Sequence, residues 1–290
     1  MKKTDLYIIE INSKITITTI LKRYLILFSS VVFLIGCAVT DNKVSSLLKN
    51  YHLTKKIIKT DFFEHSYVLK ENISSNRLHI YIHGDGTPWI KGRWKAADPT
   101  PQNLLTLKLM LQDPQNSLYI ARPCYHSTVI QSECNSELWT SARYSKDIIS
   151  SVVKAAKTLS YQYNEIVLIG YSGGAVIATL AAEQLDKTVA LITIAGNLDT
   201  DYWAFTKKLK PLKTSINPIA EDFKNLPETI IHIVGQKDKV VPMQVTKGFA
   251  DKYTSATWRY SSFDHSCCWN NNWKSILNRV NNKITNNKNL

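Results

Sequence analysis

Three residues of the chain have the types and the order that nucleophilic catalysis requires: Ser172, Asp238 and His265. A serine hydroxyl is a poor nucleophile until a base takes its proton, and a neutral imidazole has a pKa suited to that task near neutral pH. An aspartate can hold the imidazole in the correct tautomer and stabilise the imidazolium that forms. Together they predict acyl transfer to water through an acyl-serine intermediate.

The serine lies between a predicted buried strand and a predicted helix. Residues 165–169 are mostly apolar and β-branched, residues 170–174 read Gly-Tyr-Ser-Gly-Gly, and residues 175–185 favour a helix. Glycines flanking such a sharp turn remove side chains that would collide with neighbouring backbone. The N-terminus of the helix directs backbone N–H donors at a developing oxyanion. The alternative is a tight connection in which the serine only caps the helix.

The two partners follow later strands. Asp238 comes just after the predicted buried strand 229–235, and His265 follows the predicted strand 256–260. The carboxyl ends of parallel strands meet at one sheet edge, so both residues are expected near the serine. Asp199, which follows the predicted strand 189–194, is an alternative acid. Asp264 is adjacent to His265, but side chains of neighbouring residues on an extended segment point in opposite directions. Asp264 is therefore not expected to orient the imidazole.

A further motif lies upstream, where the predicted strand 77–82 ends in His83-Gly84-Asp85-Gly86. With the serine turn and the ordered partners, this His-Gly turn makes the chain resemble the α/β-hydrolase superfamily from about residue 63 to the C-terminus. The resemblance implies a three-layer α/β sandwich whose mostly parallel central sheet carries helices on both faces.

The resemblance also assigns roles. Ser172 would be the nucleophile, His265 the base and Asp238 the acid. The backbone N–H groups of Gly173 and Asp85 would form the oxyanion hole. The function implied is cleavage of carboxylic esters, with lipid, polyester or short-acyl substrates all open. A serine peptidase and a non-catalytic envelope lipoprotein that keeps the fold are the alternatives.

The composition of the chain limits the classes of molecule that the protein is expected to bind. The chain has a formal net charge of +13, but its lysines are scattered among asparagines without an aromatic-interleaved basic stretch. We therefore expect attraction to anionic lipid headgroups or envelope polymers, and no nucleic acid. No residues have metal-ligand spacing and no glycine-rich phosphate loop is present, so we expect no metal and no cofactor.

The N-terminus has the pattern of a bacterial lipoprotein signal over residues 1–36. Two basic residues, Lys22 and Arg23, precede the apolar stretch 24–33, and Leu-Ile-Gly-Cys ends at Cys37. Cleavage before Cys37 and its diacylation would anchor the protein to a membrane of the bacterial cell envelope. A plain signal anchor is the alternative, and the long polar stretch before Lys22 leaves a later translation start open.

Export permits disulfides among the other four cysteines. Cys124 and Cys134 lie in one polar loop and are the expected pair. Cys267 and Cys268 could form a vicinal bond or stay as two free thiols.

The remaining pattern predicts a polar tether over 37–60 and a single, monomeric domain over 61–290. Residues 201–226 interrupt the alternation of strands and helices, which suggests a small lid or one wall of the pocket. A helix is predicted over 141–161, and a closing helix over 270–281 with frayed residues after it.

Overall fold

The computed structural model describes residues 43–71, 75–127 and 131–288. The chain divides into two compact units, residues 1–44 and 45–290. Only residues 43 and 44 of the first unit are described, so the account below concerns the second. The predicted signal 1–36 and its Cys37 lie outside the described residues.

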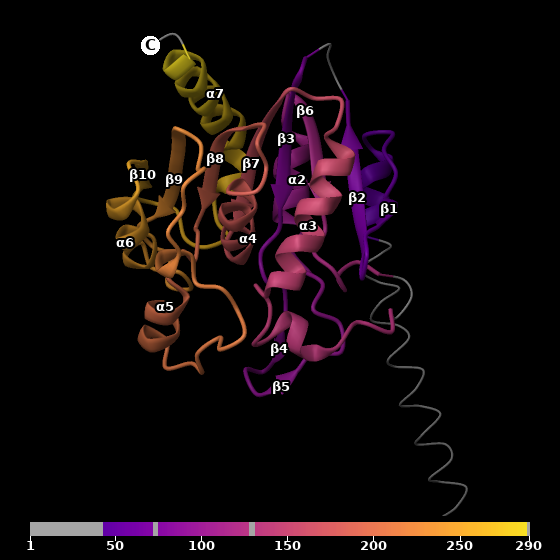
Figure 1. Ribbon diagram of the computed structural model, residues 1–290, viewed down its shortest axis with the longest axis vertical. Helices are drawn as coiled ribbons and strands as arrows, with labels where there is room; N and C mark the ends of the chain where they lie inside the picture. The colour runs from indigo at the N-terminus through magenta and orange to yellow at the C-terminus, as the bar shows by residue number, and fades with distance from the viewer. Residues whose placement is uncertain (1–42, 72–74, 128–130, 289–290) are drawn as a thin grey trace, which may run out of the picture. The chain divides into compact units, whose positions relative to one another are not determined.

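A single eight-stranded sheet organises the domain (Figure 1). Its order is β1-β2-β6-β3-β7-β8-β9-β10. The strands from β6 to β10 run parallel, whereas β2 is antiparallel to both of its neighbours. The strands are β1 Lys56–Lys59, β2 Glu64–Lys70, β3 Arg77–Ile82, β6 Asn116–Ile120, β7 Glu165–Tyr171, β8 Thr188–Ile194, β9 Thr229–Gly235 and β10 Ala256–Tyr260.

The central strands are parallel because the sequence lets both of their faces be covered. β3, β6, β7, β8 and β9 are almost wholly buried along their length. Near-continuous apolar, β-branched runs of this kind are typical of parallel sheets packed between helices. The predicted three-layer architecture is therefore confirmed.

Helices cover both faces. On one face α3 packs against α4, and α3 lies in front of the sheet in Figure 1. On the other face α2 packs against α7. The helix α7 also contacts the sheet, where the buried ring of its Trp273 meets the ring of Tyr81 in β3 edge-on. Among the described residues no helix is both long and apolar enough to cross a membrane. Residues 43–49 are helical. The further helices are α2 Leu105–Leu111, α3 Lys146–Leu159, α4 Gly173–Ala182, α5 Thr200–Thr206, α6 Gln244–Lys252 and α7 Trp269–Lys288, with short 3-10 turns at Ser136–Trp139 and Pro218–Ala220.

The predicted bounds of the tether and of the closing helix differ from the structure. The stretch expected to be tether already contains β1, which pairs with β2 through a tight turn in which Thr60 Oγ1 donates to the Phe63 carbonyl at 2.8 Å. The closing helix α7 runs to Lys288 rather than ending near 281, because Val280 and Ile284 continue its buried face. Charged and amide residues on the other face concealed that periodicity.

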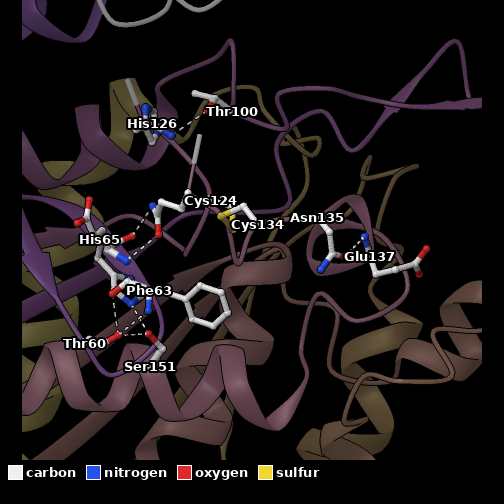
Figure 2. Close-up of a disulfide and its surroundings, with 12 residues drawn as sticks. Thr60, Phe63, His65, Thr100, Cys124, His126, Cys134, Asn135, Glu137 and Ser151 are labelled. Atoms are coloured by element: carbon white, nitrogen blue, oxygen red, sulfur yellow. Dashed lines mark hydrogen bonds between the residues drawn. A yellow bond between two sulfur atoms is a disulfide. The ribbon is translucent and has the colours of Figure 1, made fainter. Parts of the chain in front are cut away.

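The cysteines are paired. A disulfide joins Cys124 to Cys134, the expected pair, across ten residues, with Cα atoms 5.7 Å apart. Figure 2 shows it near a buried chain of hydrogen bonds in which Ser151 Oγ contacts Thr60 Oγ1 at 2.7 Å and His65 Nε2 at 2.6 Å. A second disulfide joins Cys267 to Cys268, which decides between the two states that the sequence left open.

Buried neutral histidines predict acid sensitivity. Burial lowers the pKa of His232 in β9 to about 4, and the ring contacts Thr193 Oγ1 at 2.8 Å. The unfolded pKa is about 6.5, so His232 stabilises the fold fully above that pH, and this contribution is lost as pH falls towards 4. The loss over this interval is about 3 kcal/mol of unfolding free energy. His232→Asn should lower stability at neutral pH but flatten this slope.

Urea denaturation at a series of pH values measures the slope. His52→Asn is the matched control, because His52 is exposed. An unchanged slope in His232→Asn would contradict the assignment.

Candidate active site

The predicted nucleophile lies in a strained turn between β7 and α4. Ser172 has φ 53° and ψ −121°, a region that side chains seldom occupy, and its backbone N–H donates to Ile194 O at 2.8 Å. Gly170 is required here, because a Cβ on it would lie 2.5 Å from Ala175 Cα. Such strain, held by surrounding packing, is typical of functional sites.

His265 lies beside the serine. Its Nε2 is 3.1 Å from Ser172 Oγ, and its Nδ1 is 2.8 Å from Asp238 Oδ2. The backbone carbonyl of His265 accepts hydrogen bonds from Tyr171 Oη and Trp269 Nε1, both at 2.9 Å. The strand that carries the serine and the helix that follows the histidine therefore hold this loop together.

Asp238 is fixed in the turn after β9. Its Oδ1 accepts the backbone N–H groups of Val240 and Val241, both at 2.8 Å, which leaves Oδ2 for His265. The side chain is 1% exposed. A carboxylate held this way is a rigid acceptor that selects the tautomer with a proton on Nδ1.

The competing aspartates have other partners. Asp199 caps α5, where its Oδ1 accepts from Tyr202 N at 3.0 Å and Asn217 Nδ2 at 3.2 Å. Asp264 Oδ1 accepts the N–H groups of Ser266 and Cys267 ahead of α7. The structure therefore brings Asp238, and neither alternative, to the imidazole.

The two expected oxyanion donors are neighbours. Gly173 begins α4, and a Cβ added to it would overlap Asp85 Oδ1. Within the described part of the chain, neither the Gly173 N–H nor the Asp85 N–H donates a hydrogen bond. Two unengaged N–H groups beside a serine, one at a helix N-terminus, are what an oxyanion hole requires.

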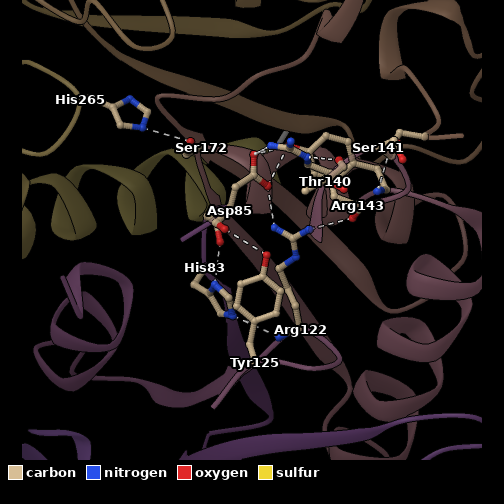
Figure 3. A network of polar contacts seen from close by, with 12 residues as sticks. His83, Asp85, Arg122, Tyr125, Thr140, Ser141, Arg143, Ser172 and His265 are labelled. Atoms are coloured by element: carbon tan, nitrogen blue, oxygen red, sulfur yellow. Dashed lines mark hydrogen bonds and ion pairs between the residues drawn. The ribbon is translucent and has the colours of Figure 1, made fainter. Parts of the chain in front are cut away.

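A buried cluster of charges beneath this loop escaped the sequence analysis (Figure 3). Asp85 Oδ1 accepts from Arg122 Nη1 at 2.6 Å, and Oδ2 accepts from Arg143 Nη1 at 2.9 Å. Tyr144 Oη donates to the same carboxylate at 2.8 Å. Both arginines are at most 5% exposed. One signal was available: Arg122 lies two residues after the end of β6, at the edge of the sheet where the site forms.

The cluster sets the charge state of the loop. Burial alone would raise the pKa of the Asp85 carboxyl, but Arg143 and Arg122 outweigh it and lower that pKa to about 2. Burial holds the pKa of His83 well below its usual value, so its ring is neutral. Its Nε2 accepts from the backbone N–H of Arg122 at 3.2 Å. Two guanidinium groups against one carboxylate leave a net positive charge beside Gly173.

Asp85→Asn should therefore destabilise the protein strongly. Removing one partner of a buried ion pair costs about 3 to 5 kcal/mol, because the remaining charge stays buried without compensation. The folded pKa is lowered, so this contribution exists above the unfolded pKa of about 3.9 and is lost as pH falls towards 2. The variant should lack that acid step.

Thermal unfolding at neutral and acid pH tests this expectation. Asp61→Asn is the control, since Asp61 is an exposed partner of Lys154. Equal stability of Asp85→Asn and wild type at neutral pH would contradict it.

Ser172 and His265 open onto a cavity of about 1490 Å³. One wall is the hairpin of β4 Trp89–Ile90 and β5 Trp94–Lys95, and another is the segment from Trp203 to Thr214. Of the segment 201–226, expected as a lid or wall, Trp203 and residues 208–214 line the cavity. No group of three or more acidic, histidine or cysteine side chains in the described ranges could hold a metal ion.

Comparison with known proteins identifies the fold. No protein-family model matches the chain, and no curated protein matches it. Mouse α/β hydrolase domain-containing protein 10 is similar in structure, with a TM-score of 0.57 and 12% identity over 80% of this chain and 99% of the mouse chain. An esterase from Pyrococcus furiosus has a TM-score of 0.56 and 16% identity over 80% of this chain and 91% of its own.

A lidless α/β serine hydrolase from Xanthomonas campestris is also similar, with a TM-score of 0.50 and 12% identity over 78% of this chain and 94% of its own. Likeness at this level of identity shows the α/β-hydrolase fold, and a shared fold does not by itself give a function.

Proposed function

We propose that this protein is a serine hydrolase that cleaves carboxylic esters through an acyl-serine intermediate. The observation that carries the proposal is the hydrogen-bonded series from Ser172 through His265 to Asp238, placed at the floor of an open cavity. The serine turn is strained and the acid is held rigidly, as preorganised catalysis requires.

Each of these residues has one role in the proposed reaction. His265 Nε2 takes the proton of Ser172 Oγ as that oxygen attacks the ester carbonyl, and returns it to the departing alkoxide. Asp238 stabilises the imidazolium between these transfers. The N–H groups of Gly173 and Asp85 stabilise the oxyanion, each by roughly 3 to 4 kcal/mol. Water then attacks the acyl-serine by the same route, with His265 again as the base.

Esters are favoured over peptides by the walls of the cavity. Trp89, Leu104, Leu107, Leu209 and Leu212 line it, and they offer apolar contact to an acyl chain. Structural similarity to an esterase supports the same choice, although that activity belongs to the neighbour.

Labelling with a fluorophosphonate tests the proposal, because such probes react with activated serines irrespective of the natural substrate. Folded protein should take up the probe, and peptide mass spectrometry should place it on Ser172. The labelled and unlabelled enzymes are then compared on esters of increasing acyl length and on the corresponding amides. Folded protein that fails to label would favour a non-catalytic lipoprotein, and faster amide cleavage would favour a peptidase.

The location is a separate proposal: that Cys37 carries a diacylglyceryl group after removal of residues 1–36, which would anchor the enzyme to a bacterial envelope membrane. The apolar stretch 24–33 followed by Leu-Ile-Gly-Cys supports it. Mass spectrometry of membrane-extracted protein should find the modified cysteine at the N-terminus, and Cys37→Ser should abolish it. An intact residue 1 in the extracted protein would contradict the proposal.

A further inference from the structure

Exposed aromatic side chains gather on the hairpin that forms one wall of the cavity. Trp89 is 39% exposed, Ile90 49% and Trp94 55%. The hairpin is held at its base, where Trp139 Nε1 donates to Ala96 O at 3.0 Å and Lys95 pairs with Glu137. Large apolar groups are therefore presented to solvent by an anchored element.

The opposite wall has the same character. Phe205 on α5 is 80% exposed, and Leu209 just after the helix is 50% exposed. Trp203 Nε1 donates to the carbonyl of Val240, itself 50% exposed, at 2.9 Å, which ties α5 to the loop after β9. Both walls lie at the same end of the domain in Figure 1 and line one cavity. We call the exposed parts of residues 89–94, 202–213 and 240 the rim.

Large exposed hydrophobic side chains are concentrated in the rim. Of the eleven large hydrophobic side chains exposed in the described part of the chain, seven belong to it. Exposed apolar groups scattered singly are normal on a soluble surface, whereas a contiguous group around a cavity marks an interaction site.

The rim is also basic. Arg93 lies over the Trp94 ring at 5.5 Å, and Lys208, Lys210 and Lys213 follow α5. All four line the cavity, and among the described residues none of them forms an ion pair with a carboxylate. Their charge is therefore available to a partner.

We propose that the rim docks on the surface of a bilayer that contains anionic phospholipid. Tryptophan and other amphipathic aromatic side chains prefer the headgroup region of membranes. Lysines near an anionic surface gain attraction that corresponds to roughly fivefold in binding for each residue. Both chemistries ring the same opening, so a single flat, negatively charged partner satisfies them together.

Docking in this way would bring the mouth of the cavity against the lipid. If the proposed hydrolase function is correct, an ester held in the bilayer reaches Ser172 without crossing water. The docking surface itself does not depend on catalysis, so it can be tested in protein that lacks the serine hydroxyl.

Hydrogen–deuterium exchange of the full chain provides the test. Ser172→Ala protein is mixed with vesicles of phosphatidylcholine alone or of phosphatidylcholine with phosphatidylglycerol. Peptides covering 88–96 and 201–214 should exchange several-fold more slowly with the anionic vesicles, and high salt should reverse the change. Peptides from α3 should exchange equally in both. A lipid anchor at the N-terminus would not change this comparison between anionic and neutral vesicles, because the same protein is mixed with both.

Variants of the rim test whether its lysines and tryptophans cause the slower exchange. Lys208→Glu, Lys210→Glu and Lys213→Glu combined should weaken docking more than about hundredfold and return exchange to the rate in neutral vesicles. Trp89→Ser with Trp94→Ser should do the same. Controls are Lys157→Glu and Tyr161→Ser, which change an exposed lysine and an exposed aromatic elsewhere.

Equal exchange in anionic and neutral vesicles at both segments would overturn the proposal. So would protection that appears without vesicles and rises with protein concentration, since the rim would then bind a second copy. Either result leaves the fluorophosphonate test of Ser172 unaffected.

Discussion

Replacing Ser172 with alanine is expected to lower kcat for ester hydrolysis by roughly 10⁶-fold. The variant keeps His265 and Asp238 but has no oxygen to attack the carbonyl, so only binding and the oxyanion donors remain. The backbone should be unaffected, because alanine can occupy the same strained turn that Ser172 adopts with φ 53°. The effect should therefore fall on kcat, with little change in stability.

The measurement is the rate on a p-nitrophenyl ester, together with the melting temperature. Ser262→Ala is the matched control, since Ser262 is exposed on the loop between β10 and His265. A Ser172→Ala variant that retains more than about a hundredth of the wild-type rate would show that another group carries the reaction.

Asp238→Asn is expected to lower kcat by about 10⁴-fold. The backbone N–H groups of Val240 and Val241 both point at Oδ1, so the amide oxygen of asparagine should occupy that position. Its NH₂ group then faces His265 Nδ1, 2.8 Å from the present carboxylate oxygen. An NH₂ donor there selects the tautomer protonated on Nε2, which cannot accept the proton of Ser172.

Asp199→Asn is the control that separates the two candidate acids. Asp199 caps α5, and asparagine is an equally good cap, so both the rate and the stability should change little. Steady-state kinetics on one ester decides the matter. A large loss of rate in Asp199→Asn with a small one in Asp238→Asn would reverse the assignment.

Local pattern was sufficient to predict the principal elements. The strand 229–235 has the predicted bounds, because a short, mostly apolar and β-branched run between polar turns is typical of a buried strand. The predicted helix over 141–161 begins only at Lys146, where Ser145 is extended and its Oγ accepts from Ile148 N. Boundaries depend on such caps, which sequence pattern resolves poorly.

The residues of the predicted catalytic series could be named from sequence because each follows its strand directly. In a parallel sheet every strand ends at the same edge, so residues that follow neighbouring strands lie close together in space. Ser172, Asp238 and His265 needed only the identity of the preceding strand to be placed together.

The charge cluster could not be found this way. Asp85, Arg122 and Arg143 come from three loops, and their side chains meet only because those loops pack beneath the serine turn. Loops have no periodicity, so their conformation is decided by the contacts they make.

The sequence by itself therefore determined the strands that precede the candidate nucleophile, base and acid, the identity of those three residues, and the pairing of Cys124 with Cys134. The period of the hydrophobic residues and the turn residues specify the local structure. Because the strands are parallel, residues that follow different strands then lie at the same edge of the sheet. Only the tertiary structure decided which aspartate contacts His265, the state of Cys267 and Cys268, and the buried partners of Asp85. It also decided which apolar and basic side chains surround the cavity. These features depend on distances of a few ångströms between segments far apart in the chain, and such distances follow from packing.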